Sequence, residues 1–299
     1  MYRKPRRICA SVLFFILTSL TIASAQSPLT AGGRVFVYDT GNKNAVIHSY
    51  MAPYKAAANL THIIELKDRL VLVDMQFAKP FADEFRAYTD SLNKPIDRIY
   101  LSHEHPDHWM GSIAFQGVPV YALQETQDFL KAHGEAVLKA KNKPGMVPEI
   151  QKIITPGTET IGGITFDISK IRDAESGAAL VIALPQMKTL IAQDLLYSGT
   201  HLFLGNDQYT NWIDVLKGLR ENYKDYEYFL PGHGAPASGP GIIDRNIGYL
   251  TKTNQAFAAH GKDMDRIKTD ILKAYPDLKA AFFVPFGLGM AFQRLQEHK

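Results

Sequence analysis

The segment Ser102-His103-Glu104-His105-Pro106-Asp107-His108-Trp109-Met110-Gly111 is the most informative part of the chain, with three imidazoles and two carboxylates in six successive residues. In an extended segment, residues i and i+2 point to the same side, so His103 and His105 can bind one metal ion. Pro106 disfavours helical backbone at His105 and is itself well suited to begin a helix. Asp107 and His108 then lie at a turn where they can face a second ion. Imidazole nitrogen and carboxylate oxygen suit zinc, with iron or manganese as alternatives.

Strands and helices alternate on both sides of this segment. The apolar pattern of the first half predicts a β-hairpin over 61–75, strands over 96–101 and 118–122, and helices over 81–92 and 124–141. In the second half we expect strands over 161–168, 179–184, 189–192 and 226–230, and helices over 212–222, 243–260 and 263–274. The two halves repeat a similar order of elements. We therefore predict an α/β fold in which two sheets pack together with helices outside.

The last part of the chain, from about residue 240 onward, is expected to be a helical extension. Residues 282–288 within it are strongly apolar. They could be buried core, a lid over a pocket or a contact between subunits. We favour buried core, because apolar clusters are usually buried.

The first residues have the pattern of an export signal. Arg3, Lys4, Arg6 and Arg7 precede an apolar run over 8–22, and the small residues 23–25 match a cleavage site. We interpret residues 1–25 as a signal peptide and residues 26–299 as a single domain that is periplasmic or secreted. The apolar run is short for a membrane span, so an uncleaved anchor is the weaker alternative and no stable membrane anchor is expected after the signal is removed. The paired arginines are also compatible with twin-arginine export.

Removing the signal changes both the charge and the cysteine content. The full chain has 33 basic and 30 acidic residues, and without the signal 29 basic residues remain against the same 30 acidic ones. A near-neutral chain without a basic stripe argues against nucleic acid and for a small-molecule substrate, with the oligomeric state left open. Cys9 is the only cysteine and lies in the signal, so the mature chain has no thiol for disulfides, nucleophilic attack or metal binding.

The His-x-His-x-Asp-His pattern resembles the signature of the metallo-β-lactamase superfamily. Residues 71–74, 191–195 and 229–234 resemble three further segments of that family, in the family's order, so the resemblance covers about residues 60–235. It implies a four-layer αββα sandwich and a hydrolase, with two zinc ions as the expected cofactor. It also implies that Asp194 bridges the two ions and that His233 completes the second site.

One position departs from the family pattern. Where the family usually has a histidine that opens a His-Thr-x-Gly stretch, this chain reads Asp173-Ala174-Glu175-Ser176-Gly177. Glu175 falls at the position of the histidine and can replace it, since a carboxylate oxygen can bind zinc. The alkylsulfatase branch of the superfamily is similar in using an acidic ligand there. Asp173 is a second possible substitute, and the rival interpretation is that Glu175 is a surface residue and the first site is weak or empty.

These observations predict a two-metal site with defined roles. We expect His103, His105 and Glu175 on one ion, Asp107, His108 and His233 on the other, and Asp194 between them. A metal-bound hydroxide would attack the substrate, with Asp107 or Asp194 orienting the nucleophile and passing a proton to the leaving group. Three nearby residues are candidates for the substrate pocket, namely Trp109, His201 and Tyr209.

The fold does not name the substrate, because one architecture carries many chemistries. The acidic Glu175 and the export signal favour a hydrolase of esters or sulfate esters. The nearest alternative is an enzyme that opens lactones or β-lactams. From other classes, a mononuclear non-haem iron dioxygenase and a non-catalytic binding protein remain as alternatives.

Overall fold

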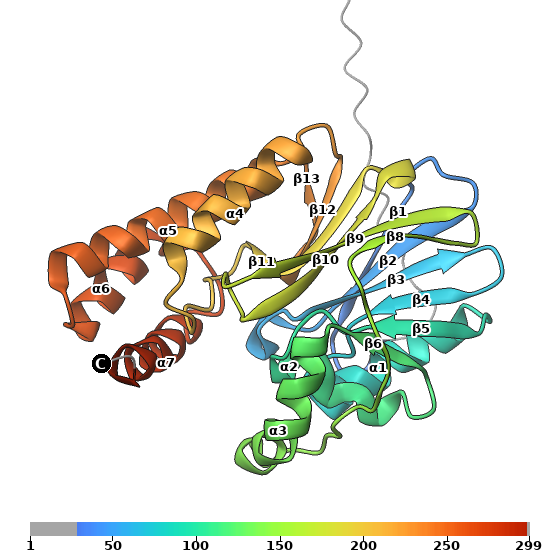
Figure 1. The fold of residues 1–299 in the computed structure, drawn as a ribbon, viewed down its shortest axis with the longest axis horizontal. Coiled ribbons are helices and arrows are strands. Elements are labelled where there is room, and N and C mark those ends of the chain that lie inside the picture. Colours follow the sequence, from blue (N-terminus) through green and yellow to red (C-terminus); the bar gives the residue numbers. More distant parts are fainter. Residues whose placement is uncertain (1–28, 298–299) are drawn as a thin grey trace, which may run out of the picture.

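Two β-sheets form the centre of the computed structural model, which describes residues 29–297 (Figure 1). The first sheet has seven strands in the order β1 to β7, and the second has six in the order β13-β12-β11-β10-β9-β8. The strands of the first sheet are β1 (Arg34–Tyr38), β2 (Ala45–Met51), β3 (Leu60–Leu66), β4 (Leu70–Val73), β5 (Ile96–Tyr100), β6 (Val120–Ala122) and β7 (Ile150–Ile153). Those of the second are β8 (Gly157–Ile161), β9 (Ile164–Arg172), β10 (Ala178–Leu184), β11 (Thr189–Ser198), β12 (Tyr228–Gly234) and β13 (Ala237–Ser238).

Helices cover the outer faces of both sheets (Figure 1). The first sheet is covered by α1 (Lys79–Ser91), α2 (Pro106–Trp109) and α3 (Gln124–Lys141). The second is covered by α4 (Tyr209–Asn222), α5 (Gly241–His260), α6 (Met264–Ala274) and α7 (Phe283–Glu297). None of the helices within residues 29–297 combines the length and the hydropathy that a membrane span requires.

The alternation of side chains along each strand produces the layers. In β4, Val71 and Val73 belong to the apolar cluster between the sheets, whereas Leu70 and Leu72 belong to the cluster beneath α1 to α3. In β10, Ile182 faces the other sheet and Val181 faces the helices. Because successive residues of a strand point to opposite faces, a strand that is covered on both faces is apolar throughout. The arrangement confirms the predicted αββα sandwich.

The two halves of the chain do repeat one plan. Strands β1 to β4 are antiparallel, α1 follows, and β5 then pairs in parallel with β4. In the second half, β8 to β11 are antiparallel, α4 follows, and β12 pairs in parallel with β11. The predicted hairpin corresponds to β3 and β4, and the predicted helix over 124–141 has the same bounds as α3.

Some elements differ from the prediction. Residues 161–168 do not form one strand, because Gly162 and Gly163 adopt positive φ values of 56° and 81° and turn the chain from β8 into β9. Strands β1, β2, β7 and β13 were not predicted from the sequence either. In the apolar stretch 282–288, the interpretation as core is right for Phe283, Val284 and Leu288, whereas Phe282 and Phe286 are exposed.

The predicted signal peptide, residues 1–25, lies outside the described residues. It therefore stays a prediction, as does the interpretation of residues 26–299 as one domain.

Candidate metal centre

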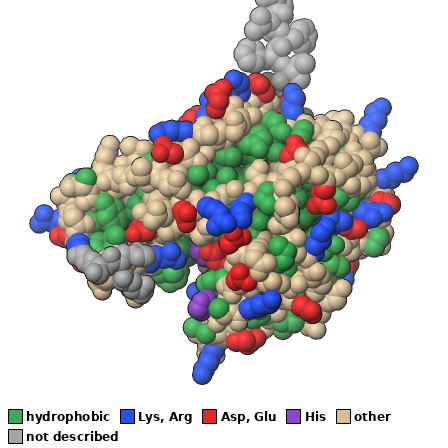
Figure 2. Space-filling model, in the orientation of Figure 1, with side chains coloured by type: hydrophobic (Ala, Val, Ile, Leu, Met, Phe, Trp, Pro, Cys, Tyr) green, Lys and Arg blue, Asp and Glu red, His purple; other side chains and the backbone are tan. Residues whose placement is uncertain are grey.

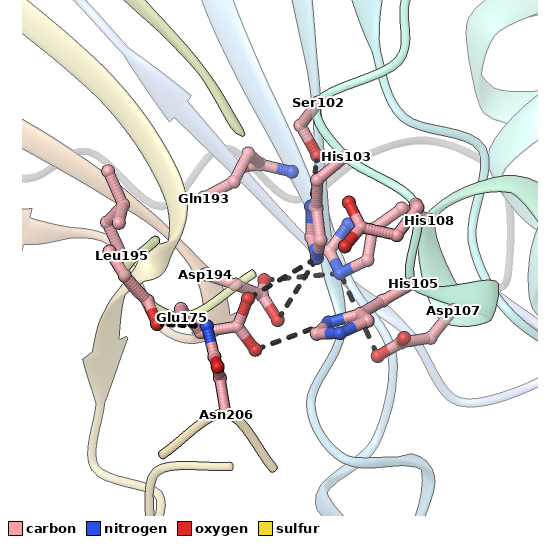
Figure 3. Close-up of polar contacts among 12 residues, drawn as sticks. Ser102, His103, His105, Asp107, His108, Glu175, Gln193, Asp194, Leu195 and Asn206 are labelled. Atoms are coloured by element: carbon pink, nitrogen blue, oxygen red, sulfur yellow. Dashed lines mark hydrogen bonds and ion pairs between the residues drawn. The ribbon is translucent and has the colours of Figure 1, made fainter. Parts of the chain in front are cut away.

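The predicted ligands come together at one edge of the sandwich, where strands of both sheets end (Figure 3). His103 follows β5, and Pro106 begins α2 as expected, with His105 in extended conformation at φ −67° and ψ 140°. From the other sheet, Glu175 lies in the turn before β10 and Asp194 lies within β11. The ends of strands that meet at one edge are a common place for a functional site in α/β proteins.

The first group of ligand atoms belongs to His103, His105, Glu175 and Asp194, and these atoms all lie within 4.8 Å of one another. The Nδ1 atom of His105 is 3.2 Å from Oε1 of Glu175, and Nε2 of His103 is 3.7 Å from Oε2 of the same carboxylate. Glu175 is buried, so the interpretation of Glu175 as a surface residue is wrong. Asp173 is exposed and does not join the group.

The second group consists of Asp107, His108, Asp194 and His233, again within 4.8 Å of one another. Asp194 joins the two groups, with Oδ1 at 3.2 Å from Nε2 of His108 and Oδ2 at 3.1 Å from Nε2 of His233. Asp107 Oδ2 lies 3.3 Å from the same nitrogen of His233. The structure thus brings all seven predicted ligands into the two groups that the sequence analysis assigned, while their binding of metal stays a prediction.

Hydrogen bonds on the outer side of the centre define the tautomers of its histidines. His108 donates from Nδ1 to Asp74 Oδ2 at 2.7 Å, and His233 donates from Nδ1 to the carbonyl oxygen of Ala57 at 2.9 Å. A neutral imidazole that carries its proton on Nδ1 has its lone pair on Nε2, which is the atom that faces the centre. Both imidazoles are therefore oriented to bind a cation through Nε2.

Asp74, directly after β4, is the acceptor that organises this outer layer. It accepts hydrogen bonds from the backbone N–H and the hydroxyl of Ser102, at 2.8 and 2.7 Å, and from His108 and the side-chain amide of Gln193. Because the Ser102 hydroxyl donates to Asp74, it accepts from Nδ1 of His103 at 2.8 Å. His103 therefore also presents the lone pair of Nε2 to the centre.

An irregularity in β11 places Gln193 and Asp194 in their different roles. The register of β11 against β12 shifts on both sides of Gln193, whose φ is +42°. The Gln193 side chain lies between the sheets, where its carbonyl accepts from Nε2 of His62 at 2.8 Å and Nδ1 of His62 accepts from Ser49 at 2.7 Å. Burial lowers the pKa of His62 to about 4, so this imidazole is neutral. Bulges of this kind are a recurrent means of redirecting a side chain at a functional site.

The buried polar atoms of the centre fit a bound metal. Nε2 of His103, Nε2 of His108, Oε2 of Glu175 and Oδ1 of Asp194 are all buried and make no hydrogen bond. Leaving such atoms unpaired is costly, and a cation coordinated by them would satisfy all of them together. Gly232 is needed beside them, because a Cβ atom there would lie 1.7 Å from Oδ1 of Asp194.

The charges of these groups depend on one another. Burial lowers the pKa of His233, but Asp194 and Asp107 outweigh it and raise that pKa to about 10. Burial likewise opposes the charge of His105, yet Glu175 raises its pKa to about 9. Burial raises the pKa of Glu175 to about 7 against the effect of His105. A metal ion that binds here must therefore displace protons.

Tyr197 is a member of the site that the sequence analysis missed. Its hydroxyl donates to Oδ2 of Asp194 at 3.0 Å and lies 3.4 Å from Oε1 of Glu175, and its ring stacks on His233 at a centroid distance of 5.1 Å. Burial and the charge of Asp194 hold the pKa of Tyr197 well above its usual value, so the hydroxyl remains a donor. Only its position three residues after Asp194 hinted at this role.

The three residues predicted to line the substrate pocket are all buried and have polar partners of their own, so their role in the pocket stays a prediction. Trp109 is fully buried and donates from its indole N–H to a backbone carbonyl at 2.8 Å. His201 is buried with Nδ1 at 2.9 Å from the hydroxyl of Tyr249, and Tyr209 is buried and donates to a backbone carbonyl before α4. Large rings gain more from burial in the core than from exposure at a pocket, and their polar atoms have partners there.

Two facing sheets with paired histidine and carboxylate groups at their edge define a metal-binding αββα protein. The family model of the metallo-beta-lactamase superfamily matches residues 29–233. The chain belongs to this superfamily and is an enzyme of its hydrolase class, as the resemblance implied. Metallo-beta-lactamase IND-1 of Chryseobacterium indologenes is 23% identical over 257 residues, which are 81% of this chain and 98% of that protein.

Solved structures show the same fold at low sequence identity. The mono-zinc form of the metallo-beta-lactamase FIM-1 from Pseudomonas aeruginosa has a TM-score of 0.56 and 18% identity, covering 73% of this chain and 95% of that one. The stereoselective inverting sec-alkylsulfatase Pisa1 from Pseudomonas sp. has a TM-score of 0.59 and 18% identity. That match covers 82% of this chain but 48% of Pisa1, so this chain corresponds to about half of that enzyme.

Proposed function

We propose that this protein is an exported metal-dependent hydrolase of esters or sulfate esters, with two zinc ions held by the two groups of ligands. One observation carries the proposal: Glu175 is buried and lies within reach of His103 and His105, so that it completes the first group with a carboxylate. An anionic ligand donates more charge to a metal than imidazole does. The metal-bound water at this site is therefore expected to be less acidic than at a site with three histidines. The similarity in fold to a sec-alkylsulfatase supports sulfate esters as substrates.

The position of each residue in the site indicates its role in the proposed reaction. Zinc bound here would supply Lewis acidity, lowering the pKa of water and polarising the substrate oxygen. Asp107 has the most exposed carboxylate of the centre, with 22% of its side chain accessible, against 4% for Asp194 and 1% for Glu175. We therefore infer that Asp107 orients the attacking water and passes its proton to the leaving group. Asp194 and Tyr197 hold the two groups of ligands in register.

Two further expectations belong to this proposal. The substrate is a small molecule, since basic and acidic side chains are interspersed on the face shown in Figure 2 rather than gathered as a phosphate backbone would require. Export rests on the basic and apolar pattern of residues 1–25.

A second candidate function is β-lactam hydrolysis. It is favoured by the similarity of 81% of the chain to the metallo-beta-lactamase IND-1. Both functions use the same metal centre and differ in the shape of the substrate and in the bond that is broken.

The test is a substrate panel with a matched pair of variants. The zinc-loaded mature protein would be assayed on nitrophenyl esters, a nitrophenyl sulfate, a lactone and a β-lactam, together with His105→Ala and His133→Ala. His133 is exposed on α3 and belongs to neither ligand group, so its removal controls for the loss of an imidazole. We expect turnover of an ester or sulfate ester that is lost with metal in His105→Ala and kept in His133→Ala. Full activity of His105→Ala would overturn the proposal, and turnover of the β-lactam alone would select the second candidate.

A further inference from the structure

Four phenylalanines lie ring against ring beside the metal centre, in a cluster that we call the phenylalanine wall: Phe203, Phe282, Phe283 and Phe286. Phe203 lies before α4, Phe282 lies directly before α7, and Phe283 and Phe286 lie in the first turn of α7. The ring of Phe203 is 5.6 Å from that of Phe286 and 6.1 Å from that of Phe283, and Phe282 and Phe283 are 5.0 Å apart. These separations are typical of packed aromatic pairs.

The wall touches both ligand groups. The ring of Phe203 meets His105 edge-on at 5.3 Å, and the ring of Phe283 meets His233 edge-on at 5.0 Å. His105 belongs to the first group of ligand atoms and His233 to the second. Phe203 and Phe283 are themselves buried, so the wall runs from the two ligand groups to the exposed rings of Phe282 and Phe286.

Two members of the wall are exposed to solvent. Phe282 and Phe286 are 48% and 50% exposed, the highest values for large apolar side chains in the described part of the chain. Their neighbours Val284 and Leu288 are buried, and Gly287 lets α7 approach the backbone at Leu204. Packing thus holds the exposed rings in place, and a fixed apolar patch next to a catalytic centre is typical of a binding surface.

We propose that the exposed face of Phe282 and Phe286 binds an alkyl or aryl group of the substrate next to the scissile bond. This inference rests on the proposed function and specifies its substrate class: amphiphilic esters or sulfate esters with an apolar group. The charge at the edge of the wall agrees with an anionic substrate, because Nζ of Lys141, at the end of α3, lies 5.3 Å from the ring of Phe286. The helix α7 lies beyond residues 29–233, where the chain matches its family, so this selectivity belongs to the C-terminal part of this chain.

The first test measures how activity depends on the length of the apolar group. Nitrophenyl esters from acetate to hexanoate would be assayed with the zinc-loaded wild type, Phe286→Ala and Met264→Ala. Met264, on α6, is also exposed and apolar but lies outside the wall. We expect kcat/KM of the wild type and of Met264→Ala to rise about twofold per methylene, which is roughly what half-burial of each group yields. In Phe286→Ala, the decrease in kcat/KM relative to the wild type should grow with the length of the acyl chain and appear mainly as a higher KM. The same dependence on chain length in Phe286→Ala as in the wild type would overturn the inference.

A binding measurement separates this inference from the proposed function. Octylphosphonate and methylphosphonate would be titrated into the same three proteins by calorimetry, which requires no turnover. We expect the wild type and Met264→Ala to bind octylphosphonate more tightly than methylphosphonate. A ratio of the two affinities that is at least fivefold smaller in Phe286→Ala supports the inference even if no ester is hydrolysed. Equal preference in all three proteins would refute it. Sedimentation could also refute it. If the wild type and Met264→Ala are dimers, Phe286→Ala is a monomer and phosphonate binding is the same in all three, the patch is a subunit contact.

Discussion

At the scale of residues, the metal centre is defined by hydrogen bonds that lie outside it. His103, His108 and His233 each engage Nδ1 in a hydrogen bond, so each presents Nε2 to the centre. Such outer hydrogen bonds fix both the tautomer and the orientation of a histidine ligand. The acceptor Asp74 serves two of these histidines, one directly and one through Ser102. The precision of the site therefore depends on side chains that bind no metal.

The Tyr197 hydroxyl is the first of these outer groups to test. In Tyr197→Phe, Asp194 loses the hydrogen bond of 3.0 Å that orients it, and we expect metal to dissociate about 10- to 100-fold more readily. Tyr209→Phe is the matched control, since it removes a buried hydroxyl that donates to a backbone carbonyl away from the ligands. Competition with a chromophoric chelator measures the metal affinity. Equal affinities in the two variants would show that Tyr197 acts only in packing.

The coupling of protons to metal can also be measured. His105 and His233, with pKa values of about 9 and 10, are protonated at pH 7, and both must be neutral to bind metal. We therefore expect zinc uptake at pH 7 to release at least two protons and the apparent affinity to rise as the pH increases from 6 to 9. Calorimetric titration in two buffers with different ionisation enthalpies counts the protons. Uptake without proton release would contradict the charge states described for the site.

The sequence predicted the candidate ligands, but it did not predict the side chains that orient them. The motif of His103, His105 and His108 can be recognised in the sequence because these residues are close together in the chain. Gln193 bonds to His62, 131 residues away, and to Asp74, 119 residues away. Pairing of this kind depends on how two sheets face each other, which no local pattern encodes. The sequence also did not reveal that Trp109, His201 and Tyr209 are buried, since nearness in sequence to a candidate ligand does not tell which way a ring points.

At the scale of elements, β11 and α7 position the site. Because the register of β11 is irregular, Gln193 points into the space between the sheets and Asp194 points to the metal centre. Helix α7 brings Phe283 against His233. The sequence predicted strands and helices where apolar periodicity was clear. It did not reveal the turn at Gly162 and Gly163, because the apolar Ile161 and Ile164 on either side of it read as one strand.

The close approach of α7 predicts opposite effects for two of its glycines. A Cβ atom at Gly287 would lie 2.5 Å from the backbone nitrogen of Leu204, so Gly287→Ala should lower the free energy of unfolding by about 1–3 kcal/mol. Gly289 has open space around its Cβ position, and Gly289→Ala should raise that free energy by roughly 0.5–1 kcal/mol. Urea denaturation of both variants measures the difference. A Gly287→Ala variant as stable as Gly289→Ala would mean that α7 does not pack as described.

At the scale of the whole molecule, the two repeated halves meet at Asp194. The first half supplies the histidines after β5 and at α2, and the second supplies Glu175, Asp194 and His233. Each half contributes incomplete ligand groups, so the centre forms only when the two sheets pack. This order of segments follows the family pattern, which is why the sandwich could be predicted from the sequence. The C-terminal helices lie outside that pattern, and their place over the site could not be predicted.

We propose above all that Glu175 completes the first of two metal sites that share Asp194. The most direct test is the metal content per chain, by mass spectrometry, of the wild type, Glu175→Ala and Asp173→Asn after zinc loading. Asp173→Asn removes the other acidic group of the same turn while keeping a side chain that tolerates the local φ of +52°. We expect two zinc ions in the wild type and in Asp173→Asn, and one or none in Glu175→Ala. Two ions in Glu175→Ala, or one ion in all three proteins, would contradict it.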